Sequence, residues 1–158
     1  MTPASHTPLS RLVIDGHLEQ VPVDGDTCHE LVHQGRNHAL TAAAGREIGD
    51  FEGAFQIAYD GCRKVCLVLA LAYGVRAKGD TGHQAATFNA AAAALASNIT
   101  ARDLVDEATD LRFIRAGSQY RAEKITAAAV NDAIDILNAL VGALPPVMDA
   151  RLASSPTP

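Results

Sequence analysis

Tryptophan is absent from this chain of 158 residues, and aromatic residues make up only 4% of it. A core must therefore be built mainly from Ala, Leu, Val and Ile, which let helices pack at close spacing. Cysteine is also scarce: three cysteines, an odd number in a chain without an export signal, favour reduced thiols. Cys62 and Cys66 are four residues apart and are expected to be small buried hydrophobic residues on one helix face.

Long apolar segments and excess positive charge are missing as well. The longest uninterrupted apolar run, residues 65–73, is far too short for a membrane span, and the first ten residues lack the pattern of a signal peptide. The sequence thus predicts a cytoplasmic protein with no membrane partner. Because the formal net charge is −5, binding of nucleic acid would require a local basic patch.

Helix signals occupy most of the chain. Thr27 and Glu30 have the spacing of a capping box, which predicts a first helix that ends at Gly45. A second helix is expected from about Asp50 to Gly74. Its second half is apolar on both sides, at Leu67, Val68 and Leu71, which predicts either a central helix or the seam of a dimer.

Three further helices are expected. The third runs from about residue 80 through the alanine-rich residues 85–96, and the fourth follows a cap at Thr100 and reaches about Tyr120. The fifth begins at a Thr126 cap, and Pro145 and Pro146 should end it, with a last turn to about residue 152. Within the second helix, Asp60 and Lys64 have the spacing of an intrahelical ion pair.

The N-terminal region has a different pattern. Asp15-Gly16 between short apolar segments is typical of a type I′ turn, which predicts a β-hairpin over residues 11–23. Residues 1–10 and 153–158 are expected to be disordered, and residues 26–152 to form one helical domain. The predicted fold class is therefore all-α, a four- to five-helix up-and-down bundle with a short N-terminal β-hairpin.

One segment matches a metal-binding motif. His29, Glu30 and His33 have the HExxH spacing of zinc peptidases, in which two histidines on one helix face bind zinc and the glutamate activates its water. The sheet and the third ligand that accompany this motif are not evident, and Glu30 has an alternative explanation in the capping box. We therefore expect no metal site here.

Basic residues gather at the end of the fourth expected helix. A guanidinium offers a fork of donors that matches phosphate, so Arg115 is a candidate phosphate ligand. The alternative is structural: the helix is acidic in its first half and basic in its second half, which complements the helix dipole without any ligand, and the arginines could pair with acids on neighbouring helices. The residues of this region are Arg112, Arg115, Ser118, Gln119, Tyr120, Arg121 and Lys124.

Two blocks of the chain together resemble the HEPN domains, small all-α modules of prokaryotic toxin, antiviral and RNA-processing systems. In residues 110–120, Arg115 stands where the family's ribonuclease signature has its arginine, Ala116 stands at its polar position, and Tyr120 takes the place of its histidine. The first block spans residues 50–83. Its matching residues are Asp50, Gly53, Ala54, Ala58, Tyr59, Asp60, Arg63, Lys64, Gly74, Arg76 and His83.

The resemblance implies RNA as the ligand, metal-independent cleavage without a cofactor, a homodimer with a shared cleft, and a cognate antitoxin or nucleotidyltransferase as partner. Arg115 would stabilise the developing negative charge. Tyr120 is a weak base because its ordinary pKa is about 10, and His83 is the candidate substitute. The candidate catalytic residues are thus Arg115, Tyr120 and His83, and the candidate RNA-binding residues are Arg112, Arg115, Arg121 and Lys124.

The expected function is therefore RNA-directed, as a ribonuclease-toxin relative or as a degenerate RNA-binding member of a prokaryotic defence or toxin–antitoxin system. Whether the chain is an enzyme is left open by the replaced histidine. The alternative is a non-enzymatic helical module for dimerisation or partner binding, and a zinc peptidase is third.

Overall fold

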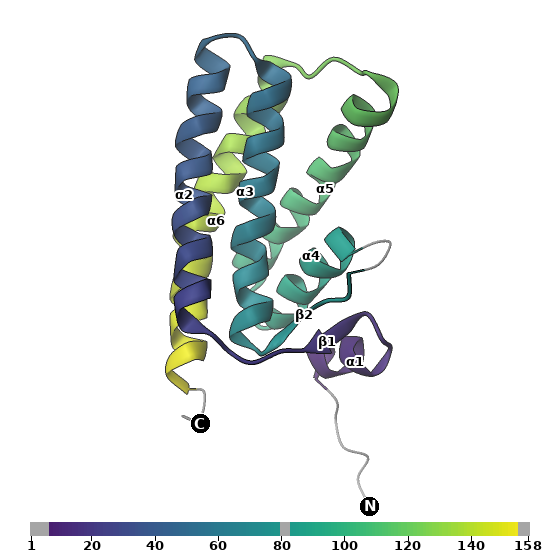
Figure 1. Cartoon of the computed structure of the whole chain (residues 1–158), viewed down its shortest axis with the longest axis vertical. Coiled ribbons are helices and arrows are strands. Elements are labelled where there is room, and N and C mark those ends of the chain that lie inside the picture. Colours follow the sequence, from purple (N-terminus) through teal and green to yellow (C-terminus); the bar gives the residue numbers. More distant parts are fainter. Residues whose placement is uncertain (1–6, 80–82, 155–158) are drawn as a thin grey trace, which may run out of the picture.

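The computed structural model describes residues 7–79 and 83–154. Helices α2, α3, α5 and α6 form an up-and-down bundle, with α4 beside its lower half and α1 with the strands at one end (Figure 1). The predicted all-α fold with a short pair of antiparallel strands is confirmed. Within the described ranges the elements are α1 (Pro8–Ile14), β1 (Leu18–Gln20), α2 (Gly25–Glu47), α3 (Phe51–Ala72), β2 (Val75–Ala77), α4 (His83–Ala94), α5 (Ile99–Arg121) and α6 (Ala127–Ser154).

Helix α3 is the central helix of the bundle. It packs against α2, α4, α5 and α6, and Phe55, Cys62 and Leu69 along it are fully buried. In its second half Val68 is buried, while Leu67 and Leu71 are partly buried. Because helices of the same chain cover both sides of α3, its double apolar character requires no second subunit. The prediction of a central helix is confirmed. The apolar character of α3 therefore no longer supports a dimer interface along this helix.

Two glycines allow α2, α3 and α6 to approach closely. A Cβ atom added at Gly35 of α2 would lie 2.5 Å from Cγ2 of Val65, and one added at Gly61 of α3 would lie 2.7 Å from Cδ2 of Leu137. The same Cβ at Gly61 would lie 3.1 Å from Cβ of His38. Side chains at these two positions would push the helices apart, so we name Gly35 and Gly61 the glycine seam.

The three cysteines are buried, free thiols in this core. Burial raises the pKa of Cys62 to about 12 and the pKa of Cys66 well above its ordinary value. Such thiols are uncharged at neutral pH and poor nucleophiles. The prediction that Cys62 and Cys66 act as small hydrophobic residues is confirmed.

The N-terminal strands are not those that the Asp-Gly turn predicted. Residues 8–14 form α1, so residues 8–10, expected to be disordered, are its first turn; Asp15 caps α1, and Gly16 follows with a φ of 81°. Strand β1 instead pairs with the distant β2. The physical reason is burial: Leu9 and Leu18 pack with Val75 and Ala90 in a second, smaller core that an isolated hairpin lacks.

The start of α2 also differs from the prediction. Its N-cap is Asp24, whose carboxylate accepts hydrogen bonds from the backbone N–H groups of Asp26 and Thr27. The hydroxyl of Thr27 donates to the same carboxylate at 2.8 Å, and Glu30 accepts a hydrogen bond from the side chain of Gln34. The Thr27–Glu30 capping box was therefore wrong, because a carboxylate three residues earlier caps the helix first.

Two further helix boundaries were misplaced. Helix α5 begins after Asn98, whose side chain accepts a hydrogen bond from the N–H of Ala101, so the predicted cap at Thr100 was wrong. Helix α6 continues through Pro145 and Pro146 to Ser154. Pro145 is buried, and Met148 beyond it lies in the bundle core. Pro145 and Pro146 have no backbone N–H to donate within the helix. The free energy gained by packing the segment after them into the core outweighs the loss of these hydrogen bonds.

By length and composition alone, α6 is the one helix of the described residues that could cross a membrane. In this structure its apolar stripe, with Val130, Leu137 and Leu144, is buried in the bundle, while Asp132 and Asp135 are exposed. The core of the bundle accounts for its apolar character.

Candidate functional site

Arginines from two helices converge on Tyr59 of α3. The guanidinium of Arg115, on α5, lies 5.3 Å from the centroid of the Tyr59 ring. The hydroxyl of Tyr59 donates a 2.8 Å hydrogen bond to Oε1 of Gln84 on α4. Three helices therefore fix one ring and one guanidinium, and we call this group, with Arg63 and Arg112, the Tyr59 cluster.

The electrostatics of the Tyr59 cluster are dominated by positive charge. Burial raises the pKa of Tyr59, and the charges of Arg115, Arg112 and Arg63 offset only part of that increase. Arg63 is neutralised by an ion pair with Asp60 at 2.8 Å. Among the described residues, however, neither Arg112 nor Arg115 forms an ion pair. The structural alternative, in which acids on neighbouring helices pair with these arginines, is not what the described residues show.

The other candidate residues lie apart from Arg115. Tyr120 is 81% exposed, and five residues along a helix place it about 140° around the axis from Arg115. Arg121 donates to Glu123 at 2.7 Å, and Lys124 is exposed in the loop after α5. His83 begins α4, one residue before Gln84, but its side chain lies outside the described part of the chain. The structure does not bring Arg115 and Tyr120 together.

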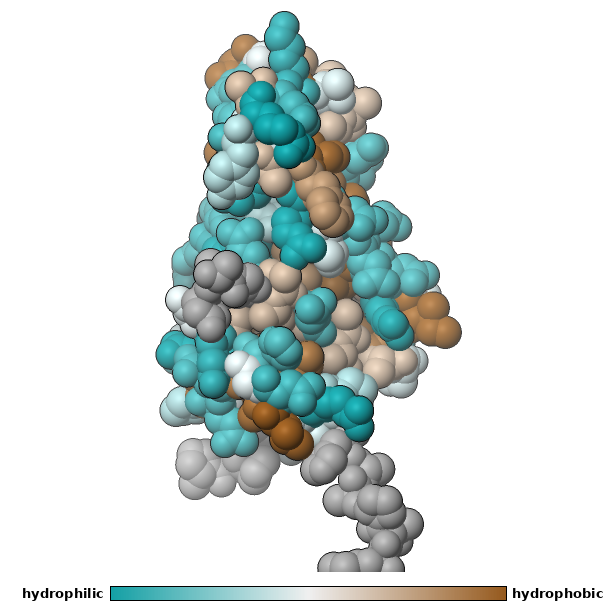
Figure 2. All heavy atoms as spheres, turned by 90° about the vertical axis from the view of Figure 1, so that its right-hand side faces the viewer, coloured by the Kyte–Doolittle hydropathy of each residue, from teal (hydrophilic) through white to brown (hydrophobic). Residues whose placement is uncertain are grey.

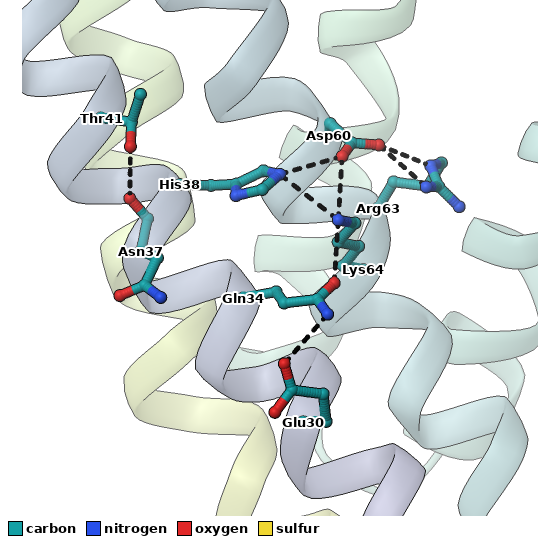
Figure 3. A network of polar contacts seen from close by, with 8 residues as sticks. All are labelled: Glu30, Gln34, Asn37, His38, Thr41, Asp60, Arg63 and Lys64. Carbon is teal, nitrogen blue, oxygen red and sulfur yellow. Dashed lines mark hydrogen bonds and ion pairs between the residues drawn. The ribbon is translucent and has the colours of Figure 1, made fainter.

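A second polar group connects α2 to α3 (Figure 3). Asp60 is its centre: one carboxylate oxygen accepts from Arg63 at 2.8 Å and 3.1 Å, and the other lies 3.1 Å from Nε2 of His38. Lys64 is 3.5 Å from Asp60, as the helical spacing predicted, and donates to Gln34 at 3.0 Å. We call these residues the Asp60 network.

The Asp60 network holds its carboxylate in the charged form. Burial alone would raise the pKa of Asp60, but hydrogen bonds from Arg63 and the charges of Arg63 and Lys64 outweigh burial and lower it. Arg63 belongs to both groups, since its charge also acts on Tyr59. The Tyr59 cluster and the Asp60 network thus form one polar belt around the middle of α3.

The two histidines of the HExxH segment have separate partners. Nε2 of His29 lies 3.0 Å from Oδ1 of Asp149 on α6, whereas Nε2 of His33 lies 3.2 Å from Nδ2 of Asn37 on the same helix. In residues 7–79 and 83–154, no three His, Cys, Asp or Glu side chains gather as metal ligands would.

Charge differs between the two sides of α5. A groove of about 310 Å³ between α5 and α6 is lined by Glu107, Asp110, Asp132 and Asp135, which would repel a polyanion. Figure 2 looks from the side on which α5 lies and shows hydrophobic side chains set among hydrophilic ones. On the side of α5 that faces α3, Arg115 lies over Tyr59 and, with Arg112, acts on the charge of its hydroxyl.

His38 and Gln34 were missed by the sequence analysis. Both belong to the Asp60 network, and both lie on α2 next to the glycine seam. The available signal was weak: two polar residues four apart, with a glycine between them, on the face of a helix that packs against another helix.

Comparisons of the chain with protein-family models, with curated proteins and with solved structures return no match.

Proposed function

We propose that this chain is an RNA-directed protein of the HEPN-like class, and that it binds the phosphate backbone of RNA at the Tyr59 cluster. Arg115 carries the proposal. Its guanidinium is stacked over an aromatic ring, and it has no ion pair among the described residues. Stacking orients the guanidinium plane while leaving its N–H donors for an anion, and Arg112 adds a second positive charge.

The arrangement favours binding over efficient cleavage. Tyr120 is exposed and points to a different side of α5 from Arg115, so it is poorly placed to act as a base beside the arginine. A general base typically contributes about 10²–10⁴-fold to a rate. We therefore expect little metal-independent cleavage, and we expect His83→Ala to leave RNA binding unchanged while testing whether His83 supplies any residual activity.

The test is binding of a fluorescein-labelled single-stranded RNA, followed by anisotropy at several salt concentrations. Arg115→Ala should weaken binding about tenfold, equivalent to ~1.4 kcal/mol. Loss of one phosphate contact should also reduce the slope of log K against log salt by about 0.7. Arg115→Lys keeps the charge but loses the planar fork, so its affinity should lie between those of the wild type and Arg115→Ala.

Arg36→Ala is the matched control, because Arg36 is exposed on α2 and the substitution removes the same charge elsewhere. Its effect on RNA affinity should be small. Equal losses of RNA affinity in Arg36→Ala and Arg115→Ala would mean that RNA binding depends only on the net charge of the protein and not on the Tyr59 cluster. No measurable RNA binding by the wild type at low salt would rule the function out.

A second candidate function, a dimerisation module, is favoured by the outer face of α5. Phe113 is 65% exposed and Tyr120 is 81% exposed on that face. On that face Asp106 and Asp110 precede Phe113 and Arg121 follows it, so two copies of α5 packed antiparallel would place opposite charges together. We infer a homodimer through α5. Arg115 lies about 160° around the helix axis from Phe113, so it is not part of this interface and stays available for RNA.

The remaining partners, a cognate antitoxin or nucleotidyltransferase, rest on the resemblance to HEPN domains alone, and the cytoplasmic setting stays a prediction from the sequence. An exposed aromatic face on α5 is a suitable surface for a protein partner. A zinc peptidase is not proposed, because His29 and His33 contact different residues, Asp149 and Asn37.

A further inference from the structure

A cavity of about 620 Å³ is lined by residues of α1, β1, β2, α4 and α6. Figure 1 shows α1 and the strands at the end of the bundle where α6 also ends. We name this cavity the basal cavity. Its volume falls within the range of about 300–1,000 Å³ that is typical of small-molecule sites. Its walls are mostly apolar and come from α1, β2 and α4. The apolar lining residues are Pro8, Leu9, Val13, Ile14, Val75, Ala93 and Ala94.

The lining of the basal cavity also includes a positively charged residue. Arg151 of α6 is the only charged residue among the described residues that line the basal cavity. Its guanidinium lies 4.4 Å from the centroid of the Tyr73 ring, which lines the same cavity. Stacking on the ring fixes the position of the guanidinium, and a guanidinium has five N–H donors to share among partners. The cavity therefore offers apolar surface on several sides and a fixed positive charge on another.

Part of the apolar lining is exposed to solvent. Ile14 lines the cavity and is 64% exposed, although it lies on the same short helix as the buried Leu9. Contact between the Ile14 side chain and an apolar group of a ligand would remove apolar surface of both from water, which is favourable.

The polar lining residues besides Arg151 are Thr7, Ser10 and Gln20. A fully polar anion such as inorganic phosphate would bind Arg151 and these polar residues, but it would leave the apolar walls in contact with water. The lining therefore favours an amphipathic ligand.

We propose that the basal cavity binds a small amphipathic carboxylate, with its hydrocarbon chain between α1, β2 and α4 and its carboxylate at Arg151. Carboxylate oxygens match the guanidinium fork, and the chain replaces water against Val13, Val75 and Ala94. The site includes Tyr73, at the C-terminal end of α3, and shares no residue with the Tyr59 cluster near the middle of that helix, so the proposal does not depend on RNA binding.

The experiment is a titration of the full chain with sodium octanoate, followed by amide chemical shifts. Saturable shifts should centre on Val13, Val75 and Ala94. Affinity should rise roughly tenfold for each pair of methylenes from butanoate to octanoate. Octan-1-ol has the same chain without the charge, and it should bind at least about tenfold more weakly than octanoate.

Substitutions separate the two parts of the site. Arg151→Gln should bring octanoate affinity down to that of octanol, Arg151→Lys should retain most of it, and Ala94→Leu should block both ligands by filling the cavity. Arg11→Gln is the control, because it removes an exposed charge from α1 outside the cavity. The proposal is overturned by the absence of saturable shifts at millimolar octanoate, by equal binding of octanol, or by unchanged affinity in Ala94→Leu.

Discussion

Ala122 is the only non-glycine residue with a positive φ in the described part of the chain, at 52°. It ends α5, and its N–H donates to the carbonyl of Gly117 in the left-handed capping geometry. A side chain in this conformation costs roughly 1–2 kcal/mol relative to glycine. We expect Ala122→Gly to raise the free energy of unfolding by about 1 kcal/mol, and the thermal midpoint by about 2–4 °C, in a calorimetric scan.

Ala116→Gly is the matched control for this prediction. Ala116 lies inside the same helix with an ordinary φ, where glycine should destabilise by roughly 0.5–1 kcal/mol. Two changes of the same type, six residues apart, should therefore have opposite signs. Destabilisation by both would show that the left-handed cap does not exist in solution.

Asp60 makes stability depend on pH. Its folded-state pKa is lowered, so it stabilises the fold above the unfolded value of about 3.9, and that contribution is lost as the pH falls through the still lower folded value. Asp60→Asn should therefore be less stable than the wild type at pH 7 in urea unfolding, and the difference should shrink below about pH 4.

Asp103→Asn provides the comparison for Asp60, because Asp103 is exposed on α5. A surface change of this type usually alters stability by less than about 0.5 kcal/mol. If the difference between the wild type and Asp60→Asn stayed constant from pH 7 to pH 3, the Asp60 network would not hold a charged carboxylate.

At the scale of elements, the glycine seam predicts a second pair of opposite effects. A Cβ at Gly61 would meet Leu137 at 2.7 Å, whereas a Cβ at Gly142 of α6 would meet nothing within 4 Å. Gly61→Ala should destabilise by roughly 1–3 kcal/mol through overpacking. Gly142→Ala should stabilise by up to about 1 kcal/mol through helix propensity. Urea unfolding measures both, and equal stability of the two variants would disprove close packing at the seam.

Local signals were sufficient to predict several helices. Asp50 caps α3 through the N–H of Gly53, Gly74 ends it with a φ of 73°, and Thr126 accepts a hydrogen bond from Ala129 at the start of α6. Each of these signals acts within a few residues of the chain. Helix α1 and the pairing of β1 with β2 depend on burial against distant residues, which periodicity does not report.

In the candidate site, too, some contacts follow from local sequence, whereas others depend on how distant helices pack. The Asp60–Lys64 pair follows from helical spacing, and Arg115 was selected for its guanidinium and its place in a resemblance. The contact of Arg115 with Tyr59 requires the packing of α5 on α3, and the contact of His38 with Asp60 requires the glycine seam. Tyr120 was grouped with Arg115 because of sequence spacing, but helix geometry separates them.

For the whole molecule, the outer face of α5 predicts a homodimer. Burying a side chain such as Phe113 in a dimer interface would stabilise the dimer by roughly 1.5–3 kcal/mol, whereas in the monomer this side chain is exposed to water. Light scattering at tens of micromolar should give about twice the chain mass of 16.5 kDa. Phe113→Ser should yield the monomer, because it removes apolar area at the centre of the proposed interface.

Ile48→Ser is the control for nonspecific hydrophobic association, because Ile48 is 83% exposed at the end of α2 rather than on α5. This variant should remain dimeric. A wild-type mass of 16.5 kDa at these concentrations, or an unchanged dimer in Phe113→Ser, would exclude pairing through α5.

The pairing of β1 with β2 has a consequence for the order in which the molecule assembles. Helices α2 and α3 are joined by only residues 48–50, so they can meet with little loss of chain entropy. The strand pair, held by the ion pair of Arg76 and Glu19, joins residues 57 positions apart and closes a long loop for few contacts. The helix pair should thus form early and the strand pair late. The basal cavity then appears last during folding and is lost first in a local opening.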